Sequence, residues 1–198
     1  MCTTDKKELR RTLLSLRRAI GEEEKRLLDG ALCKKITTHR YFNEADALLA
    51  YLPMRGEPDL TPILEIAAAR GIPVFLPRCD ENGMRFLLFE GNDRLVKDRF
   101  GILSPRVGAR EVAPTKKTLC IVPGLAAGRD GSRLGYGGGF YDRFLPRFGG
   151  SLLFAVYERL VFDTLPHEPH DCLIPPSDII TEKGETTYAD PHSGAPKL

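Results

Sequence analysis

The spacing of apolar positions predicts two helices at the N-terminus. Leu9, Leu13, Leu16 and Ile20 recur every three or four residues, as on the buried face of an amphipathic helix. The arginines of this segment lie off that stripe; they are Arg10, Arg11, Arg17 and Arg18. Gly21 ends the first helix, and a second is expected over residues 22–38, where three opening glutamates suit a helix N-terminus.

Short apolar runs bounded by glycine and proline predict the strands of a sheet. They cover residues 46–53, 71–77, 84–89, 118–124, 151–157 and 178–182. A helix with Thr61 as N-cap and Pro62 at its first position joins the first two runs. Strand, helix and strand in succession form a βαβ unit, which requires parallel strands. Residues 84–89 are expected at a sheet edge, and residues 90–116 are expected to be irregular.

The alternation of strands and helices predicts an α/β fold, a single-domain three-layer αβα sandwich with a mainly parallel central sheet. The domain is expected to span residues 1–183, followed by a polar, disordered tail over 184–198. Ligands of such folds bind beyond the carboxyl ends of the strands. Two predicted loops lie there: residues 54–59, after the first strand, and the glycine-rich residues 124–139.

Composition narrows the class of partners. A formal net charge of +2 over 198 residues is too small to indicate a nucleic-acid or membrane surface. There is no apolar N-terminal signal segment, and no apolar run reaches the ~20 residues of a membrane span, so we expect a cytoplasmic protein. The five cysteines are odd in number and contain no CxxC pair, which argues against a disulfide framework and a zinc site.

The segment RLGYGGGFYDRFL, residues 133–145, carries the strongest chemical signal. Its four glycines precede a helix expected to begin near Gly139, so successive amides can turn toward one anion. Arg133 can add a bidentate donor, and Asp142 is a candidate magnesium ligand beside a bound triphosphate. The segment lacks the Gly-Lys-Ser/Thr of a P-loop, and Phe140 replaces the last glycine of a dinucleotide fingerprint. The alternative interpretation is a tight turn before a helix whose aspartate interacts with the dipole.

The longer run VPGLAAGRDGSRLGYGGGFYDRFL, residues 122–145, resembles the signature of the 5-formyltetrahydrofolate cyclo-ligase family, or 5,10-methenyltetrahydrofolate synthetases. KKELR, YLPMRGEPD, FGILSP, LPHEPHD and DIITE resemble further family segments in the same order, so the resemblance spans residues 6–182. It implies ATP- and Mg²⁺-dependent cyclisation of 5-formyltetrahydrofolate to 5,10-methenyltetrahydrofolate, with release of ADP and phosphate. The implied route is phosphorylation of the formyl oxygen, ring closure by N10 and loss of phosphate.

The resemblance also implies roles for individual residues. Arg133 and Asp142 are the implied catalytic residues, and Asp142 and Asp171 the implied metal ligands. The implied ATP-binding residues are Lys6, Arg10, Arg133, Leu134, Gly135, Tyr136, Gly137, Gly138, Gly139, Phe140 and Tyr141. The implied substrate-binding residues are Leu52, Met54, Glu57, Tyr136, Phe140 and Tyr141. The expected partner is a small molecule, 5-formyltetrahydrofolate with or without a polyglutamate tail, bound by a monomer without a nucleic-acid or membrane partner.

Several positions depart from the family pattern. Ala127 and Gly128 stand where Phe-Asp is usual, Phe140 replaces a tyrosine, Ser104 an acid and Leu160 a glutamine. These departures keep two alternatives open: a non-catalytic paralogue that binds ATP or folate, and an ATP-dependent ligase with another substrate.

Two further points concern the basic residues and the histidines. The sequence leaves open whether Lys6 or Lys7 contacts phosphate. His167 and His170 invite a zinc interpretation, but neither a helix nor a third ligand supports it.

Overall fold

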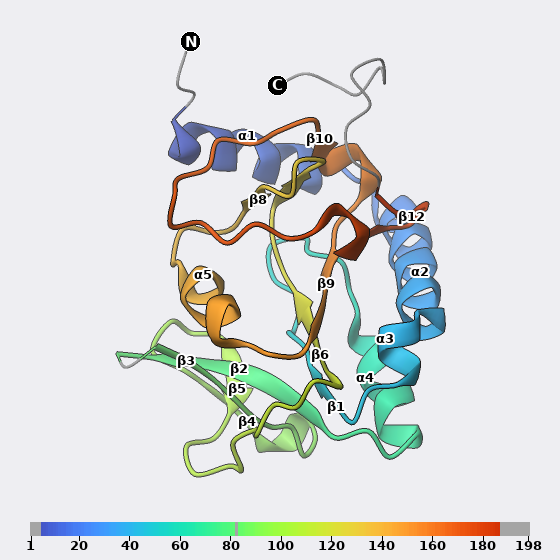
Figure 1. Ribbon diagram of the computed structural model, residues 1–198, viewed down its shortest axis with the longest axis vertical. Coiled ribbons are helices and arrows are strands. Elements are labelled where there is room, and N and C mark those ends of the chain that lie inside the picture. The colour runs from blue at the N-terminus through green and yellow to red at the C-terminus, as the bar shows by residue number, and fades with distance from the viewer. Residues whose placement is uncertain (1–4, 82, 187–198) are drawn as a thin grey trace.

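A seven-stranded sheet forms the centre of the protein in the computed structural model, which describes residues 5–81 and 83–186 (Figure 1). The strand order is β12-β11-β9-β6-β1-β2-β3. The strands are β1 (Ala47–Leu49), β2 (Val74–Asp80), β3 (Gly83–Leu88), β6 (Thr118–Val122), β9 (Ser151–Ala155), β11 (Ile179–Thr181) and β12 (Gly184–Glu185). The inner strands from β11 to β2 pair in parallel, and β12 and β3 are antiparallel edges. The predicted α/β fold, its mainly parallel sheet and the edge position of residues 84–89 are confirmed.

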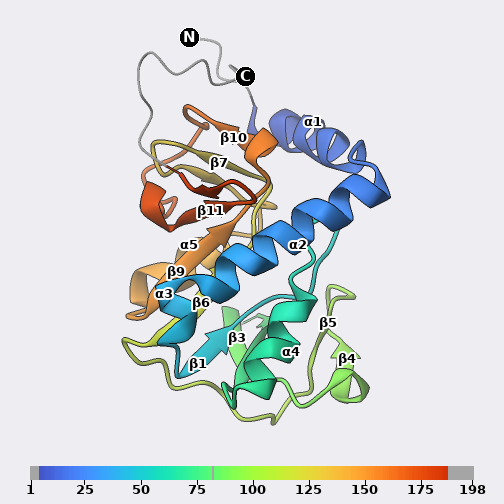
Figure 2. The same cartoon turned by 90° about the vertical axis from the view of Figure 1, so that its right-hand side faces the viewer.

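Helices cover both faces of this sheet, as the two views in Figures 1 and 2 show. On one face lie α2 (Glu22–Thr38), α3 (Arg40–Asn43) and α4 (Thr61–Ala69), and on the other lies α5 (Phe140–Phe144). α1 (Lys6–Arg18) lies across the carboxyl ends of the strands. α2 begins and ends where the sequence predicts. In α4 Pro62 lies in the first turn as predicted, but Thr61 is the first helical residue and Leu60 is the N-cap, so the predicted N-cap is wrong by one position. The carboxylate of Asp59 accepts the Thr61 amide at 3.0 Å.

Two segments predicted to lack strands contain small sheets. β7 (Ala126–Gly128) pairs with β8 (Arg133–Leu134) and β10 (Val161–Phe162), so a hairpin lies inside the predicted loop 124–139. β4 (Leu95–Lys97) and β5 (Leu103–Pro105) form a hairpin inside the predicted irregular segment. Short 3-10 helices complete the fold: η1 (Asn92–Arg94), η2 (Leu145–Arg147), η3 (Glu158–Leu160) and η4 (Pro176–Asp178). Strands of two or three residues are too short to show a period of two in the sequence, which is why both predictions were wrong.

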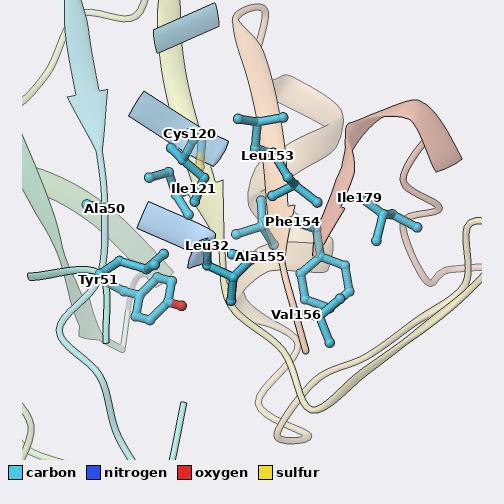
Figure 3. Packing of buried hydrophobic residues seen from close by; sticks show 14 of the residues in the cluster. Leu32, Ala50, Tyr51, Cys120, Ile121, Leu153, Phe154, Ala155, Val156 and Ile179 are labelled. Atoms are coloured by element: carbon cyan, nitrogen blue, oxygen red, sulfur yellow. The ribbon is translucent and has the colours of Figure 1, made fainter. Parts of the chain in front are cut away.

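The core lies between the sheet and the helices on both sides. Every residue of β6 is buried, and Cys120 and Ile121 of this strand belong to the same buried hydrophobic cluster as Leu32 of α2 (Figure 3). A parallel strand covered on both faces is expected to read as a continuous apolar run, as TLCIV does.

The buried face of α1 differs from the predicted leucine stripe. Leu9, Leu13 and Arg17 are buried, whereas Leu16 is 50% exposed and Arg17 only 2%. The apolar period cannot identify such a position, because a guanidinium is buried only where polar acceptors surround it.

The C-terminal segment begins in the sheet. Gly184 and Glu185, assigned to the tail by the sequence analysis, form β12, and the Thr186 hydroxyl donates to the Pro176 carbonyl at 2.7 Å. The rest of the predicted tail, 187–198, and Cys2 lie outside the described residues. Within the described ranges, the helices are too short or too polar to cross a membrane.

Candidate active site

A cavity of about 960 Å³ opens beyond the carboxyl ends of β1 and β6, which are adjacent and parallel. The loop after β1 supplies one wall, and the segment from Pro123 to Arg143 supplies another. The N-terminal half of α1 and the loop containing Asp171 close the cavity from the side. The volume lies at the upper end of the range for small-molecule sites.

The structure brings every predicted site residue to this one cavity. Its lining includes Lys6, Arg10, Leu52, Met54, Glu57, Arg133, Leu134, Gly135, Tyr136, Gly137, Gly138, Gly139, Phe140, Tyr141, Asp142 and Asp171. Lys6 lines the cavity, whereas Lys7 is exposed on α1 and does not. Of the two lysines between which the sequence could not choose, Lys6 is therefore the better placed to contact a ligand in the cavity.

The main-chain amides of Gly135–Gly139 are available to a ligand. Among the described residues, none of these amides donates a hydrogen bond within the protein, and β8 ends at Leu134. Gly137 and Gly139 have φ values of 96° and 63°, which favour glycine, and Gly139 directly precedes α5. Unpaired amides in left-handed turns form the concave donor surfaces that bind anions.

Arginine side chains pack against this glycine backbone. The Arg10 Nε donates to the Gly135 carbonyl at 2.9 Å, and an added Cβ at Gly137 would lie 3.3 Å from the Arg10 Cζ. The Arg143 Nη2 donates to the Gly138 carbonyl at 3.0 Å, and a Cβ at Gly139 would meet the Arg143 Nη1 at 2.7 Å. The glycines therefore admit guanidinium groups as well as turning the chain.

Asp142 forms a salt bridge with Arg133. Its Oδ1 accepts from the Arg133 Nη2 at 2.7 Å and from the Cys172 amide at 3.3 Å. The Arg133 side chain is 3% exposed and also donates to the Pro123 carbonyl at 3.2 Å. Carboxylate and guanidinium, both predicted to serve the nucleotide, are thus paired with each other.

Asp171 pairs in the same way with the N-terminal helix. Its Oδ2 accepts from the Lys6 Nζ at 2.6 Å and from the Glu168 amide at 2.7 Å. Burial raises the pKa of Asp171, but these hydrogen bonds outweigh it and leave the pKa below its usual value. Burial likewise lowers the pKa of Lys6, and its carboxylate partners reverse that shift.

The loop of Asp171 also gathers possible metal ligands. Oxygen and nitrogen atoms of Glu168, His170 and Asp171 lie within 4.8 Å of one another, so Asp171 supplies the third group that the zinc interpretation lacked. The His167 ring instead contacts the Leu165 carbonyl at 3.0 Å. The Lys6 ammonium lies 3.2 Å from Glu168 and 2.6 Å from Asp171, so one positive charge already compensates part of the charge of these two carboxylates.

Glu57 is a buried carboxylate in the opposite wall. It is 2% exposed, and its Oε2 accepts the Met54 amide at 2.9 Å. Burial raises the pKa of Glu57, and hydrogen bonds from the Tyr136 hydroxyl and the Met54 amide oppose that rise. The turn that carries it is strained at Arg55, a non-glycine residue with φ of 51°. A carboxylate held in this way is directed at the cavity.

Two buried polar atoms at the cavity have no partner among the described residues. They are the Tyr141 hydroxyl and the Arg133 Nε. Both atoms are covered by neighbouring groups although their residues line the cavity, so each lowers the stability of the protein without being exposed to a ligand.

Sequence reasoning missed several residues of the site. Phe100 and Ile102, in the loop before β5, and Leu103, the first residue of β5, line the cavity. The Phe100 and Phe140 rings meet edge to face with centroids 5.8 Å apart. The FGILSP segment contributes to the family resemblance, but the resemblance implies no role for its residues. The sequence does not identify Arg17 as a buried residue, because an arginine in an amphipathic helix ordinarily faces solvent.

Most departures from the family pattern lie away from the cavity. Ala127 and Leu160 are fully buried in the core, and a Cβ at Gly128 would meet the Ser132 Oγ at 2.1 Å. The Ser104 hydroxyl accepts from the Arg78 Nη1 at 2.9 Å and is outside the lining. Only Phe140 reaches the cavity. The departures that left open the interpretation as a non-catalytic paralogue therefore lie mainly in the core.

Fold and cavity define an α/β protein whose cavity joins a wall of glycines and arginines to a more apolar wall that contains Glu57. A model of the 5-formyltetrahydrofolate cyclo-ligase family matches residues 2–182, and the chain belongs to that family. It is 32% identical over 185 residues to the 5-formyltetrahydrofolate cyclo-ligase of Mycolicibacterium smegmatis, across 86% of this chain and 91% of that protein. It is 31% identical over 133 residues to the Escherichia coli enzyme, across 65% of this chain and 73% of that one.

Solved structures agree with this assignment. The NMR structure of Aquifex aeolicus 5,10-methenyltetrahydrofolate synthetase superposes with a TM-score of 0.79 at 31% identity, over 95% of both chains. The synthetase from Mycoplasma pneumoniae shares the fold, with a TM-score of 0.70 at 22% identity, over 90% of this chain and 98% of that one.

Proposed function

We propose that this chain catalyses the ATP- and Mg²⁺-dependent cyclisation of 5-formyltetrahydrofolate to 5,10-methenyltetrahydrofolate. The observation that carries the proposal is the meeting of two different walls in one cavity, a glycine and arginine wall and a wall containing Glu57. Family membership supplies the reaction, since relatives and a solved neighbour bear cyclo-ligase or synthetase names. We also expect a cytoplasmic monomer.

The reaction needs ATP because an amide oxygen is a poor leaving group. The formyl oxygen attacks the γ-phosphorus and ADP leaves, so that the formyl carbon becomes an electrophilic iminium carbon. N10 attacks that carbon and loses its proton, and the C–O bond then breaks with release of phosphate. The protein has little covalent chemistry to do, so positioning and charge neutralisation carry the catalysis.

The glycine wall fits the phosphates of ATP. We assign the amides of Gly135–Gly139 to the phosphate oxygens, together with Arg10, Lys6 and Arg133. Arg133 and Lys6 now pair with Asp142 and Asp171, and both pairs line the cavity, so a bound polyphosphate can recruit the cations. Neutralisation of the γ-phosphate by Arg133 supports attack by the weakly nucleophilic formyl oxygen.

The carboxylates of Asp142 and Asp171 fit Mg²⁺, which takes one or two carboxylates together with phosphate oxygens. Both line the cavity, and both now accept hydrogen bonds from a cationic side chain that the ion would have to replace in part. When bound, the ion neutralises charge on the phosphates.

The wall around Glu57 fits the folate. A carboxylate can accept two N–H groups of the pterin, and the Met54 amide and Tyr136 hydroxyl hold it in place. Leu52, Met54, Phe140 and Tyr141 surround it with apolar surface for the rings.

An absorbance assay tests the proposal. Purified protein with 5-formyltetrahydrofolate, ATP and Mg²⁺ should form the methenyl product, and omission of ATP should abolish it. Absence of product despite ATP binding would favour the non-catalytic paralogue, and ATP hydrolysis with another acceptor in a substrate screen would favour the related ligase. Monoglutamate and polyglutamate substrates compared in the same assay give the tail preference, and light scattering gives the oligomeric state.

A further inference from the structure

Arg17 is a buried cation on the cavity side of α1 with no role assigned so far. It lies one turn beyond Leu13 on the buried face of the helix and is 2% exposed. Its guanidinium reaches away from the helix to two other segments of the chain, and its stem contacts a third. Burying an arginine costs free energy, and an apolar side chain at such a position is often as stabilising or more so. The contacts that compensate for this cost therefore indicate what the residue does.

The first contacts anchor the guanidinium. The Arg17 Nη2 donates to the Leu125 carbonyl at 3.0 Å and to the Gly124 carbonyl, both in the turn between β6 and β7. The stem of the side chain packs on the loop that carries Glu57, because an added Cβ at Gly56 would lie 3.4 Å from the Arg17 Cγ and Cδ. With its stem and one nitrogen held, the guanidinium has a defined orientation.

The second terminal nitrogen reaches a residue of the site. The Arg17 Nη1 donates to the Tyr136 hydroxyl oxygen at 2.7 Å, and Tyr136 lines the cavity together with Glu57. The interaction of Tyr136 with Glu57 lowers the pKa of that carboxyl, against the larger effect of burial. Arg17 therefore touches both a residue of the glycine loop and, through its stem, the loop that carries Glu57.

We propose that Arg17 is a positioning residue for the folate side of the site: it orients the Tyr136 hydroxyl and supports the loop that carries Glu57. This inference rests on the proposed function, because it takes Glu57 as the folate contact. The arrangement also links the two walls, since Tyr136 belongs to the glycine loop and Glu57 to the loop after β1. Arg17 itself does not line the cavity.

The test compares Arg17→Met, Tyr136→Phe and the double variant with Arg18→Met. Arg18 is the next residue of α1 and is exposed, so its replacement is a matched control for charge and helix propensity. Binding of 5-formyltetrahydrofolate without ATP is measured by calorimetry, and the KM values for folate and ATP are measured in the absorbance assay.

Each single variant should weaken folate binding about tenfold, the size of one hydrogen bond in a charged network. The KM for ATP should change less than about twofold, because the loop amides are main-chain groups. The double variant should bind folate no more weakly than the weaker-binding single variant, because both changes remove the same hydrogen bond between Arg17 and Tyr136. Arg18→Met should match the wild type.

Other outcomes overturn the inference. If Arg17→Met lowers only the melting temperature and folded protein binds folate normally, Arg17 is structural. Multiplicative losses in the double variant would mean that the two residues act independently. If Arg17→Met does not fold, Arg17→Lys, which keeps a charge and a donor, should show the same selective loss at a smaller fold. A wild-type protein that binds no 5-formyltetrahydrofolate would overturn the proposed function itself.

Discussion

Two walls of the cavity, one formed by the segment after β6 and the other by the loop after β1, differ in the charged and polar groups that they present. The first is built of main-chain amides and arginines, and Gly137 and Gly138 are exposed. The second contains one carboxylate, Glu57, buried among apolar groups. A polyanion can bind an open wall because many donors share its charge, whereas a neutral ring system is oriented by one buried acceptor. The comparison predicts that substitutions in the two walls affect different substrates.

The largest effect is expected at Asp142. Asp142→Asn keeps the size and one acceptor for Arg133 but removes the charge that a divalent ion requires, so turnover should fall on the order of a hundredfold. Steady-state rates over a magnesium titration measure it. Asp93→Asn, at an exposed position on η1, is the control. Turnover close to wild type at saturating magnesium would contradict the metal assignment.

Replacement of Asp142 by alanine should also lower the stability of the protein. It would leave the Arg133 guanidinium, 3% exposed, without its carboxylate partner. The free energy of unfolding should therefore fall by roughly 1–3 kcal/mol, the cost of a buried group that loses its hydrogen bond. Denaturant unfolding of the alanine and asparagine variants separates this cost from the loss of turnover.

The next effect concerns the second wall. Glu57→Gln should raise the KM for folate roughly tenfold and leave the KM for ATP nearly unchanged. Because burial raises the pKa of Glu57, its charge should be lost as the pH falls through that raised pKa, and folate affinity should fall with it. In the glutamine variant this acidic limb should be absent. A pH series of folate affinity checks both statements, and an equal rise in both KM values would remove the distinction between the walls.

A smaller effect is expected in the glycine loop. Gly137 has φ of 96° with Arg10 beside it, and Gly71 has φ of 72° with open space around it. Alanine at either position should cost about 1 kcal/mol of unfolding free energy through backbone strain. Only Gly137→Ala should raise the KM for ATP, by about threefold to tenfold if one charge-assisted contact is displaced. An identical ATP dependence in both variants would mean that the loop does not contact the nucleotide.

The smallest effect on stability is expected at Lys6. The lysine pKa is raised in the folded protein, so its contribution is present below its unfolded pKa and lost as the pH rises through the folded one. The pKa of Asp171 is lowered, so its contribution is present above its unfolded pKa and lost as the pH falls through the folded one. The pair therefore stabilises the protein between about pH 4 and about pH 10.

Lys6→Met should cost less than about 1 kcal/mol in that window, because the pair is partly exposed and screened by solvent. Thermal melts at pH 7 and at pH 3 measure the difference. The KM of the Lys6→Met variant for ATP should rise, as expected for substitutions of the other residues of the first wall. A loss of stability of equal size at pH 3 would show that Lys6 acts through packing and not through its charge.

Much of the architecture could be predicted because local patterns encode it. The run TLCIV is apolar without interruption because helices cover both faces of β6, and Pro62 and Gly71 delimit α4. The hairpins β4–β5 and β7–β8 were missed because two or three residues give no period. The glycine loop could be read as an anion site because only glycine tolerates the φ values at positions 137 and 139.

The sequence alone determined the main helices, the strands of the central sheet and their mainly parallel pairing, because each depends on the conformational preference of neighbouring residues. Only the tertiary structure decided that Lys6 would meet Asp171, 165 positions away, and that Arg17 and not Leu16 would be buried on α1. Whether a polar side chain is buried depends on acceptors that other segments bring to it. The Gly124 and Leu125 carbonyls and the Tyr136 hydroxyl are such acceptors, and no pattern within α1 records them.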